Sequence, residues 1–415
     1  MTGDKKLIHQ SVAGSRLELR VGDIRGDCTV EFGGQHTFIL PPCPKGGAVS
    51  MFDATNAKAF ILSYPLIALF SSSGRVCGTI LQIAFMKSRR LTALMMLLGA
   101  VPLASADWSA TTRATTYYTS DVGLFTASQR LSRDADPTQP ALDTRLTGQG
   151  GGGVMETMAQ MTNSSVSDYG KTILDVRGDG YVFYDHTQYS NGNVGIQAKQ
   201  ILPTETSVML RYYYNPDLFL GNNLEHQSGL FKIAPERVTS QIAALHLGQK
   251  IGDDMELILF SRYGTRRYDQ AFNERDTDFW SVGPHFDWEI LPKVTLGLAY
   301  HYERGTAAGR YQPQFNDDVS YINNFAAADL DIELEEKWTI SLAFDYEKNN
   351  WLSQFQQDDR NGAIEQVFFG EALIRYRVEE NVSLHAGVQH GRRKMNVEPV
   401  AVMNTNVGMG VKAEF

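Results

Sequence analysis

The last twelve residues, 404–415, read NTNVGMGVKAEF and alternate between two kinds of side chain. The odd-numbered positions from Val407 to Phe415 are apolar, and the even-numbered positions from Asn406 to Glu414 are polar or glycine. Successive side chains of a β-strand point to opposite faces, so this pattern predicts a strand with one apolar and one polar face. The fold class follows from asking how far the pattern extends toward the N-terminus.

The same period of two recurs in the segments 294–303, 326–335, 338–347 and 382–389. Each segment runs to about 10 residues, the length a tilted strand needs to cross a bilayer. From Lys171 onward the sequence predicts about 12 strands. Within 107–170, the segments 142–147 and 154–161 would add two strands, joined by the glycine-rich turn 148–153, or this part would form a plug. We therefore expect an all-β fold, a transmembrane antiparallel up-and-down barrel of about 12–14 strands, with 171–415 as its main part.

The predicted connections alternate between short and long. Short turns are expected at 203–205, 252–254, 291–293, 336–337 and 379–380, and long polar loops at 215–236, 267–277, 305–320, 349–363 and 392–404. Short turns at one end and long loops at the other are typical of an outer-membrane barrel. The mean hydropathy of −0.26 fits, since only half of each strand would face lipid.

Aromatic side chains on the apolar faces gather at two heights. Such bands mark the two interfaces of a bilayer, and a soluble β-sandwich has no reason to sort its rings in this way. The band nearer the long loops comprises Tyr184, Tyr212, Tyr214, Tyr263, Trp280, Tyr300, Tyr302, Tyr346 and Phe368, and the band nearer the short turns comprises Trp288, Trp338, Tyr376 and Phe415.

Residues 86–106, MKSRRLTALMMLLGAVPLASA, have the order of a secretory signal peptide: basic residues, a short apolar run and an A-x-A site. Cleavage after Ala106 would leave Asp107 as the new N-terminus. Residues 1–85 show no convincing periodicity, and we expect a poorly structured leader, interpreted as a start-site artefact with synthesis beginning at Met86. A real but poorly ordered extension is the alternative.

Composition changes at the same boundary. All three cysteines, Cys28, Cys43 and Cys77, precede Met86, which suits a chain that assembles in an oxidising compartment without thiols. Residues 1–106 contain 11 Lys and Arg and 6 Asp and Glu, so the remainder contains 27 basic and 41 acidic residues, a net charge of −14. With no basic stripe, this charge argues against a nucleic-acid partner.

Taken together, the signal segment, the alternating strands and the final strand ending in Phe415 resemble Gram-negative outer-membrane β-barrel proteins of the porin-like type. The resemblance implies a location in the outer membrane after export to the periplasm, in contact with membrane lipid and lipopolysaccharide. It also implies that the last strand, with Phe415 at its end, is the signal read by the barrel-assembly machinery. It specifies an architecture and no activity.

If the apolar faces meet lipid, the other faces line a lumen with unevenly distributed charge. A register that pairs Glu335 with Thr339 would place Asp329 opposite Asp345, which is unfavourable unless water or a cation separates them. The pattern predicts a hydrated lumen whose transverse field orients polar solutes. The acidic wall comprises Asp287, Glu289, Glu303, Asp329, Asp331, Glu333, Glu335, Asp345 and Glu347, and the basic wall comprises Arg177, Lys199, Arg211, Arg262, Arg266, Arg375 and Arg377.

Three functions remain open on the sequence. The favoured one is a passive channel for small polar solutes or saccharides, and the second is a structural or adhesive barrel with a closed lumen. The third is an outer-membrane lipid hydrolase using His226 and Ser228, the only catalytic candidates. His285 and His301 with Asp287 or Glu303 form a weak metal candidate without a recognisable ligand spacing, so we expect no metal and no cofactor.

Overall fold

A computed structural model describes residues 23–24, 27–32, 36–39, 106–131, 137–139 and 148–415. The chain divides into two units, Met1–Val101 and Pro102–Phe415. In the first unit, β1 (Asp23–Ile24), β2 (Asp27–Phe32) and β3 (His36–Ile39) form a small antiparallel sheet in that order. The sequence predicts no strands there, because runs of two to six residues are too short to establish a period. Most of the predicted signal segment, 86–105, lies outside the described residues.

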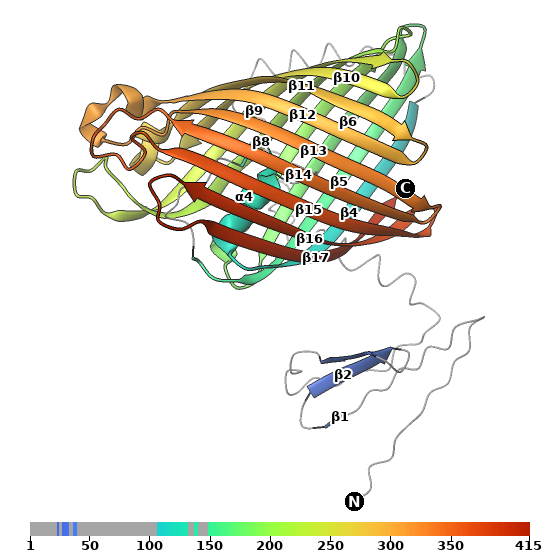
Figure 1. Ribbon diagram of the computed structural model, residues 1–415, viewed down its shortest axis with the longest axis horizontal. Coiled ribbons are helices and arrows are strands. Elements are labelled where there is room, and N and C mark those ends of the chain that lie inside the picture. Colours follow the sequence, from blue (N-terminus) through green and yellow to red (C-terminus); the bar gives the residue numbers. More distant parts are fainter. Residues whose placement is uncertain (1–22, 25–26, 33–35, 40–105, 132–136, 140–147) are drawn as a thin grey trace, which may run out of the picture. The chain divides into compact units, whose positions relative to one another are not determined.

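The second unit is a closed antiparallel barrel of 14 strands, the upper end of the predicted range (Figure 1). The sheet closes because β17 pairs with β4, and the backbone N–H of Phe415 donates to the Ala110 carbonyl at 2.8 Å. The strands are β4 (Ala106–Thr119), β5 (Gly152–Ser167), β6 (Gly170–Phe183), β7 (Asn191–Ile201), β8 (Thr206–Leu224), β9 (Ile233–Ile251), β10 (Met255–Tyr268), β11 (Thr277–Leu291), β12 (Val294–Ala307), β13 (Tyr321–Glu335), β14 (Trp338–Trp351), β15 (Ile364–Glu379), β16 (Val382–Met395) and β17 (Val402–Glu414).

The 12 strands predicted from Lys171 onward correspond to β6–β17. The prediction for the first strand of the whole barrel, 142–147, differs from the structure. The first strand is β4, whereas the predicted strand 142–147 lies outside the described residues. The sequence of β4, ADWSATTRATTYYT, places threonine on both faces and mostly small alanines among the apolar positions, so its alternation in hydropathy is weak. Its exposed rings, Trp108 and Tyr118, are the remaining sign of a lipid-facing side.

The predicted alternation of short turns and longer connections is confirmed, with one correction. Segment 215–236 is mostly strand, because β8 and β9 extend past the other strands and leave only 225–232 as their connection. The longer connections at this end of the barrel contain short 3-10 helices, which are η3 (Thr187–Tyr189), η4 (Gln270–Arg275), η5 (Ala308–Tyr311) and η6 (Pro313–Phe315). We call this end of the barrel the loop end and the other the turn end.

The predicted register between β13 and β14 is wrong by two residues. Glu335 pairs with Trp338 and Glu333 with Thr339, because an irregularity between Glu333 and Glu335 follows the tight turn. Asp329 therefore lies opposite Ala343 instead of Asp345. The direct opposition of two carboxylates, which would be unfavourable, is avoided.

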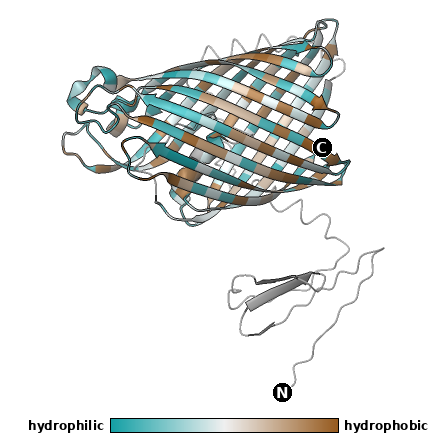
Figure 2. Cartoon of the chain, viewed as in Figure 1, coloured by the Kyte–Doolittle hydropathy of each residue, from teal (hydrophilic) through white to brown (hydrophobic). Residues whose placement is uncertain are grey.

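The outer surface of the barrel is apolar. Large side chains on the outward faces are exposed, among them Leu259, Leu298, Phe344 and Met409, which is costly in water and favourable in lipid. Hydrophobic and hydrophilic positions alternate along the barrel strands, and the connections at the loop end are largely hydrophilic (Figure 2). The described part of the chain contains no helix that is long and apolar enough to cross a membrane.

Aromatic residues of the two predicted bands form contacts between neighbouring strands on this surface. Trp338 and Tyr376 meet at the turn end, with ring centroids 4.6 Å apart. Nearer the loop end, Tyr346 and Phe368 lie 5.0 Å apart. Ring side chains at both ends of an apolar belt are the interfacial girdles of a membrane barrel.

Candidate functional site in the barrel lumen

A helix that the sequence analysis missed, α4 (Val122–Leu131), follows β4 and lies in the lumen (Figure 1). Its start is fixed by Asp121, whose carboxylate accepts hydrogen bonds from the backbone N–H of Gly123 at 3.0 Å and of Gly148 at 2.6 Å. Such capping satisfies N–H groups that have no partner inside a helix. Residues 107–170 thus contain this helix between the two strands β4 and β5.

One side of α4 packs on β4, which precedes it in the chain, and on β6, which follows it. Phe125 is fully buried and meets the rings of Tyr117, Tyr181 and Phe183 edge-on, at centroid distances of 5.4, 6.3 and 5.6 Å. Edge-to-face contacts of this kind are favourable beyond the apolar area they bury. They fix α4 against the inner faces of β4 and β6.

The other side of α4 contacts strands that lie far apart around the barrel. Leu124 belongs to a buried cluster with Leu218 of β8 and Val238 of β9, and Tyr268 of β10 and Val402 of β17 pack against this cluster. β17 is separated from β8–β10 by several strands in both directions around the barrel. The helix therefore spans the lumen and narrows it near the loop end.

Polar contacts hold α4 and the rest of the connection between β4 and β5 in place. The Arg130 guanidinium lies 2.5 Å from the Glu347 carboxylate of β14, with Glu347 fully buried. The Asn404 side chain of β17 accepts hydrogen bonds from the Ser120 hydroxyl and the Asp121 N–H, at 2.8 and 3.0 Å. Farther along, Thr138 accepts hydrogen bonds from Asn215 of β8 and Ser240 of β9. The connection is thus attached to opposite parts of the wall.

Near the loop end, the predicted acidic and basic walls are joined by ion pairs. Arg262 of β10 reaches across β11 to Glu303 of β12, at 2.5 Å. The Tyr321 hydroxyl donates to the other Glu303 oxygen at 2.6 Å and accepts a hydrogen bond from Arg266 at 2.9 Å. Three residues predicted to be on separate walls therefore form one buried network, in which the charges compensate each other.

Nearer the turn end, the acidic side chains stay together. Asp287 and Asp329 both pair in register with Gly297, and the Asp329 carboxylate occupies the space over this glycine. The Asp331 carboxylate accepts a hydrogen bond from Ser341 at 2.5 Å. Glu289, Glu333 and Glu335 are exposed, and Asp345 is buried, with its Oδ2 atom lacking a hydrogen-bond partner among the described residues.

The remaining basic residues lie on β15, next to the strands of the acidic residues, and on β6–β8, which are separated from those strands by β9 and β10. Arg177 forms an ion pair with Asp179 at 2.8 Å, and Arg211 hydrogen-bonds the side chains of Gln197 and Tyr213. Lys199 and Arg375 are partly exposed on β7 and β15, and Arg377 is exposed near the turn after Arg375. Segregated charge is therefore a feature of the half of the lumen nearer the turn end.

The candidate catalytic pair lies in the connection 225–232. The Ser228 hydroxyl donates to the Glu225 carboxylate, while the His226 ring packs edge-on against Phe231 with centroids 5.5 Å apart. Hydrogen bonds from Ser228 hold the pKa of Glu225 below its usual value. The described contacts of Ser228 are those of a loop-stabilising hydroxyl, and they do not include an imidazole.

His285 of β11 and His301 of β12, the two histidines of the weak metal candidate, lie next to each other. Their Nε2 atoms are hydrogen-bonded, and the rings stack with centroids 4.7 Å apart. The rings of Phe260 and Phe325 both contact His301, at centroid distances of 4.4 and 5.2 Å. Within the described ranges, no group of three or more His, Cys, Asp or Glu side chains has a metal-binding arrangement.

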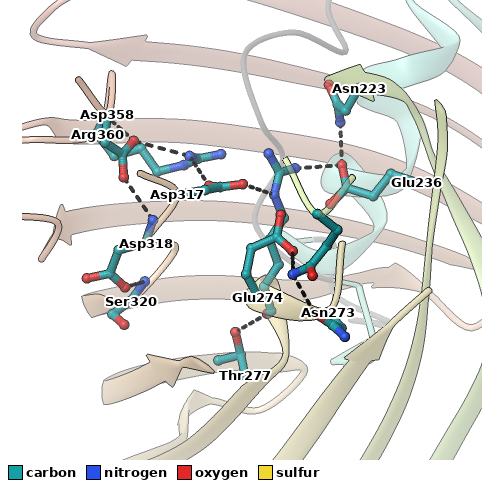
Figure 3. Close-up of polar contacts among 12 residues, drawn as sticks. Asn223, Glu236, Asn273, Glu274, Thr277, Asp317, Asp318, Ser320, Asp358 and Arg360 are labelled. Carbon is teal, nitrogen blue, oxygen red and sulfur yellow. Dashed lines mark hydrogen bonds and ion pairs between the residues drawn. The ribbon is translucent and has the colours of Figure 1, made fainter. Parts of the chain in front are cut away.

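At the loop end, a second network joins three connections and the end of β9 (Figure 3). Arg275 of η4 is buried and contacts Glu236 of β9 at 2.7 Å and Asp317 at 2.6 Å. Arg360 contacts Asp317 at 2.9 Å and Asp358 at 3.3 Å. Burial opposes ionisation of Asp317, but the two guanidinium groups outweigh it and hold its pKa below the usual value. Sequence reasoning missed this network because its charges lie scattered in loops without a period.

Comparison with known proteins gives a likeness of fold. No protein-family model matches the chain, and no curated protein does. Among solved structures, an outer-membrane channel DcaP of Acinetobacter baumannii has a TM-score of 0.44 at 10% identity, covering 75% of this chain and 97% of that one. A bacterial polysaccharide outer membrane secretin has a TM-score of 0.42 at 9% identity, covering 74% and 98%.

An anion-selective porin from Comamonas acidovorans has a TM-score of 0.36 at 7% identity, covering 75% of this chain and 99% of that one. At such identities the likeness concerns architecture alone. The closed barrel, its exposed apolar belt and its two aromatic bands define the class independently. The chain has the porin-like architecture of an outer-membrane β-barrel of Gram-negative bacteria.

Proposed function

We propose that this barrel is a passive outer-membrane channel for small polar solutes, including saccharides, narrowed by α4. The observation that carries the proposal is a closed barrel, apolar outside, whose inner wall bears the segregated charges of Asp287, Asp329 and Arg211. A wall of this kind stabilises water and polar solutes inside the membrane. Passage past α4 is the step that limits the rate.

The closed-lumen barrel is the second candidate, and the packing of α4 favours it. Phe125 and Leu124 make buried apolar contacts with β4, β6 and β8 inside the barrel. Conductance of the purified barrel in planar bilayers separates the two candidates. Discrete channels support the first, whereas their absence in the wild type and in a variant lacking 122–131 would exclude it.

The acidic patch is proposed to give the channel a preference for cations. Replacing Asp329, Asp331 and Glu333 with their amides removes three negative charges from the lumen wall, so the reversal potential in a salt gradient should move toward the value for a non-selective pore. The matched control neutralises Asp253 and Asp254, which lie in an exposed turn outside the lumen. Equal reversal potentials in the acidic-patch variant and wild type would refute the role of this patch.

Several partners follow from the location and are part of the proposal. The sequence pattern alone supports three of them: export through a signal peptide cleaved after Ala106, recognition of the strand ending in Phe415 by the barrel-assembly machinery, and contact with lipopolysaccharide. An intact-mass measurement of the native protein tests the cleavage site and whether residues 1–85 are attached. A lipid hydrolase using His226 and Ser228 would lose ester hydrolysis in Ser228→Ala, but no described contact favours it.

A further inference from the structure

The lipid-facing surface of β12–β16 carries a group of cations close to the loop end. Lys348 of β14 pairs in register with Gln366 of β15, which pairs with Lys394 of β16. Arg392, two residues before Lys394, pairs with Phe368. Arg304 of β12 is also outward-facing, but it pairs with Ile322, which pairs with Asn350, so it lies two strands away from Lys348 and one outward row nearer the loops. We call Arg304, Lys348, Arg392 and Lys394 the outer basic patch.

The register places three of these side chains, Lys348, Arg392 and Lys394, within reach of one headgroup, with Arg304 farther along the same face. Opposite residues on neighbouring strands have Cβ atoms about 5 Å apart, so Lys348 and Lys394 are about 10 Å apart across β15. Arg392 lies diagonally next to this row. Long, flexible ammonium and guanidinium side chains at this spacing can contact a single phosphorylated headgroup together.

No acidic side chain on the outward face of β12–β16 compensates this charge, and Asp278 of the neighbouring β11, diagonal to Arg304, is paired with Arg267. The outward positions at this end of β12–β16, which are the even-numbered residues 302–306, 322–324, 348–350, 364–366 and 392–394, include all four cations and no carboxylate. Among the described residues, no hydrogen bond or ion pair engages the four side chains. The inward positions at the same height carry Glu303, Glu347 and Glu365. The outer cations are therefore separated from the lumen carboxylates by the sheet.

The patch lies at the boundary between apolar and polar surface. Lys348 follows Tyr346 by one outward position, and Tyr346 packs against Phe368 in the aromatic band nearer the loops. Arg304, Arg392 and Lys394 are exposed, whereas Lys348 is half-buried. Basic side chains beside an aromatic band extend to the headgroup region of a bilayer. In outer-membrane barrels the loop end faces the exterior, so this headgroup region is that of the outer leaflet.

We propose that the outer basic patch binds the phosphate groups of an outer-leaflet glycolipid. The inference rests on the outer-membrane location and is independent of whether the lumen conducts. Unpaired cations on a lipid-facing wall fit an anionic headgroup better than neutral lipid, because phosphate oxygens accept charge-assisted hydrogen bonds from them. This lipid would line one side of the barrel, from β12 to β16.

Native mass spectrometry of the full barrel in detergent, with bisphosphorylated lipid A as the probe, tests the proposal. Lys348→Gln with Lys394→Gln should weaken binding about 30-fold, since each basic residue near an anionic lipid surface contributes about fivefold. Lys348→Arg with Lys394→Arg should retain binding. The matched control, Lys293→Gln with Lys337→Gln, removes two exposed lysines at the turn end and should leave binding unchanged.

Dephosphorylated lipid A should bind the wild type as weakly as it binds the Gln double variant. Equal affinity for both lipids, or no effect of the double variant, would overturn the proposal. Displacement of lipid A by inorganic phosphate alone would also overturn it, because the site would then recognise the free ion. Conductance is measured on the same samples, so that loss of lipid binding with intact channels refutes only the patch, and lipid binding without channels refutes only the channel.

Discussion

The ion pair between Arg130 and Glu347 offers the sharpest test of α4 as the constriction. Glu347 is fully buried and Arg130 is 17% exposed, and their charged atoms lie 2.5 Å apart. Removing one partner of a buried pair costs about 3–5 kcal/mol, because the other charge remains without compensation. When α4 leaves the wall, the unpaired Glu347 is no longer buried beneath it and this cost is avoided. Arg130→Ala should therefore raise the undocked population of α4 about a hundredfold to several thousandfold.

The assay combines conductance with chemical labelling. Residues 107–415 contain no cysteine, so replacing Cys28, Cys43 and Cys77 gives a background without thiols. Leu131→Cys then introduces a single thiol at a position that is 4% exposed in the docked helix. Undocking of the helix is measured as faster reaction of this thiol with a water-soluble reagent. We expect Arg130→Ala to speed labelling and to increase conductance.

Two controls make this prediction specific. Arg237→Ala breaks an exposed ion pair with Asp217 and should change neither readout, since such pairs contribute about 0–1 kcal/mol. Arg130→Met with Glu347→Gln removes both charges and should restore docking in large part. Unchanged labelling and conductance in Arg130→Ala would refute the view that this pair holds a constricting helix.

Three further predictions concern the loops, the wall and the last residue. Because Arg275 helps to hold the pKa of Asp317 below its usual value, the stabilisation is present at neutral pH and is lost as pH falls through that lowered pKa. Hydrogen exchange of the loop-end connections should therefore rise in acid, but should change little with pH in Asp317→Asn. Gly283→Ala should disrupt the pairing of β11 and β12, because the new Cβ would lie 1.7 Å from the Tyr300 carbonyl oxygen. The expected result is a lower unfolding temperature of the barrel, and an unchanged temperature would show that the strands can separate there. Deleting Phe415 should slow assembly in cells, measured as the fraction of heat-modifiable barrel, and equal assembly would contradict its role as a signal.

Much of the barrel could be predicted because alternation with a period of two is a local property. In segments such as 338–347 and 404–415, it determines which side chains face lipid and which face the lumen. The failures occurred where the local signal is weak. β4 has threonine on both faces, and α4 is short and has no strong period, so neither stood out in 107–170.

The candidate site was harder to predict, because its contacts depend on register. The sequence placed Arg262 and Glu303 on inward faces but could not show that they pair across β11. The tight 336–337 turn together with the irregularity beside it shifts the register by two residues from the expected one and places Asp329 opposite Ala343 instead of Asp345. Register is set by turn geometry and by the closure of the whole sheet, neither of which hydropathy records.

The sequence by itself determined a thiol-free, acidic chain after Ala106 whose strands have one lipid face and one polar face. The tertiary structure alone decided that the sheet closes between β17 and β4, that Arg130 meets Glu347, and that α4 occupies the lumen. The physical reason is the range of the interactions. Alternation acts between neighbouring residues, whereas closure and plugging bring together side chains from opposite ends of the barrel domain.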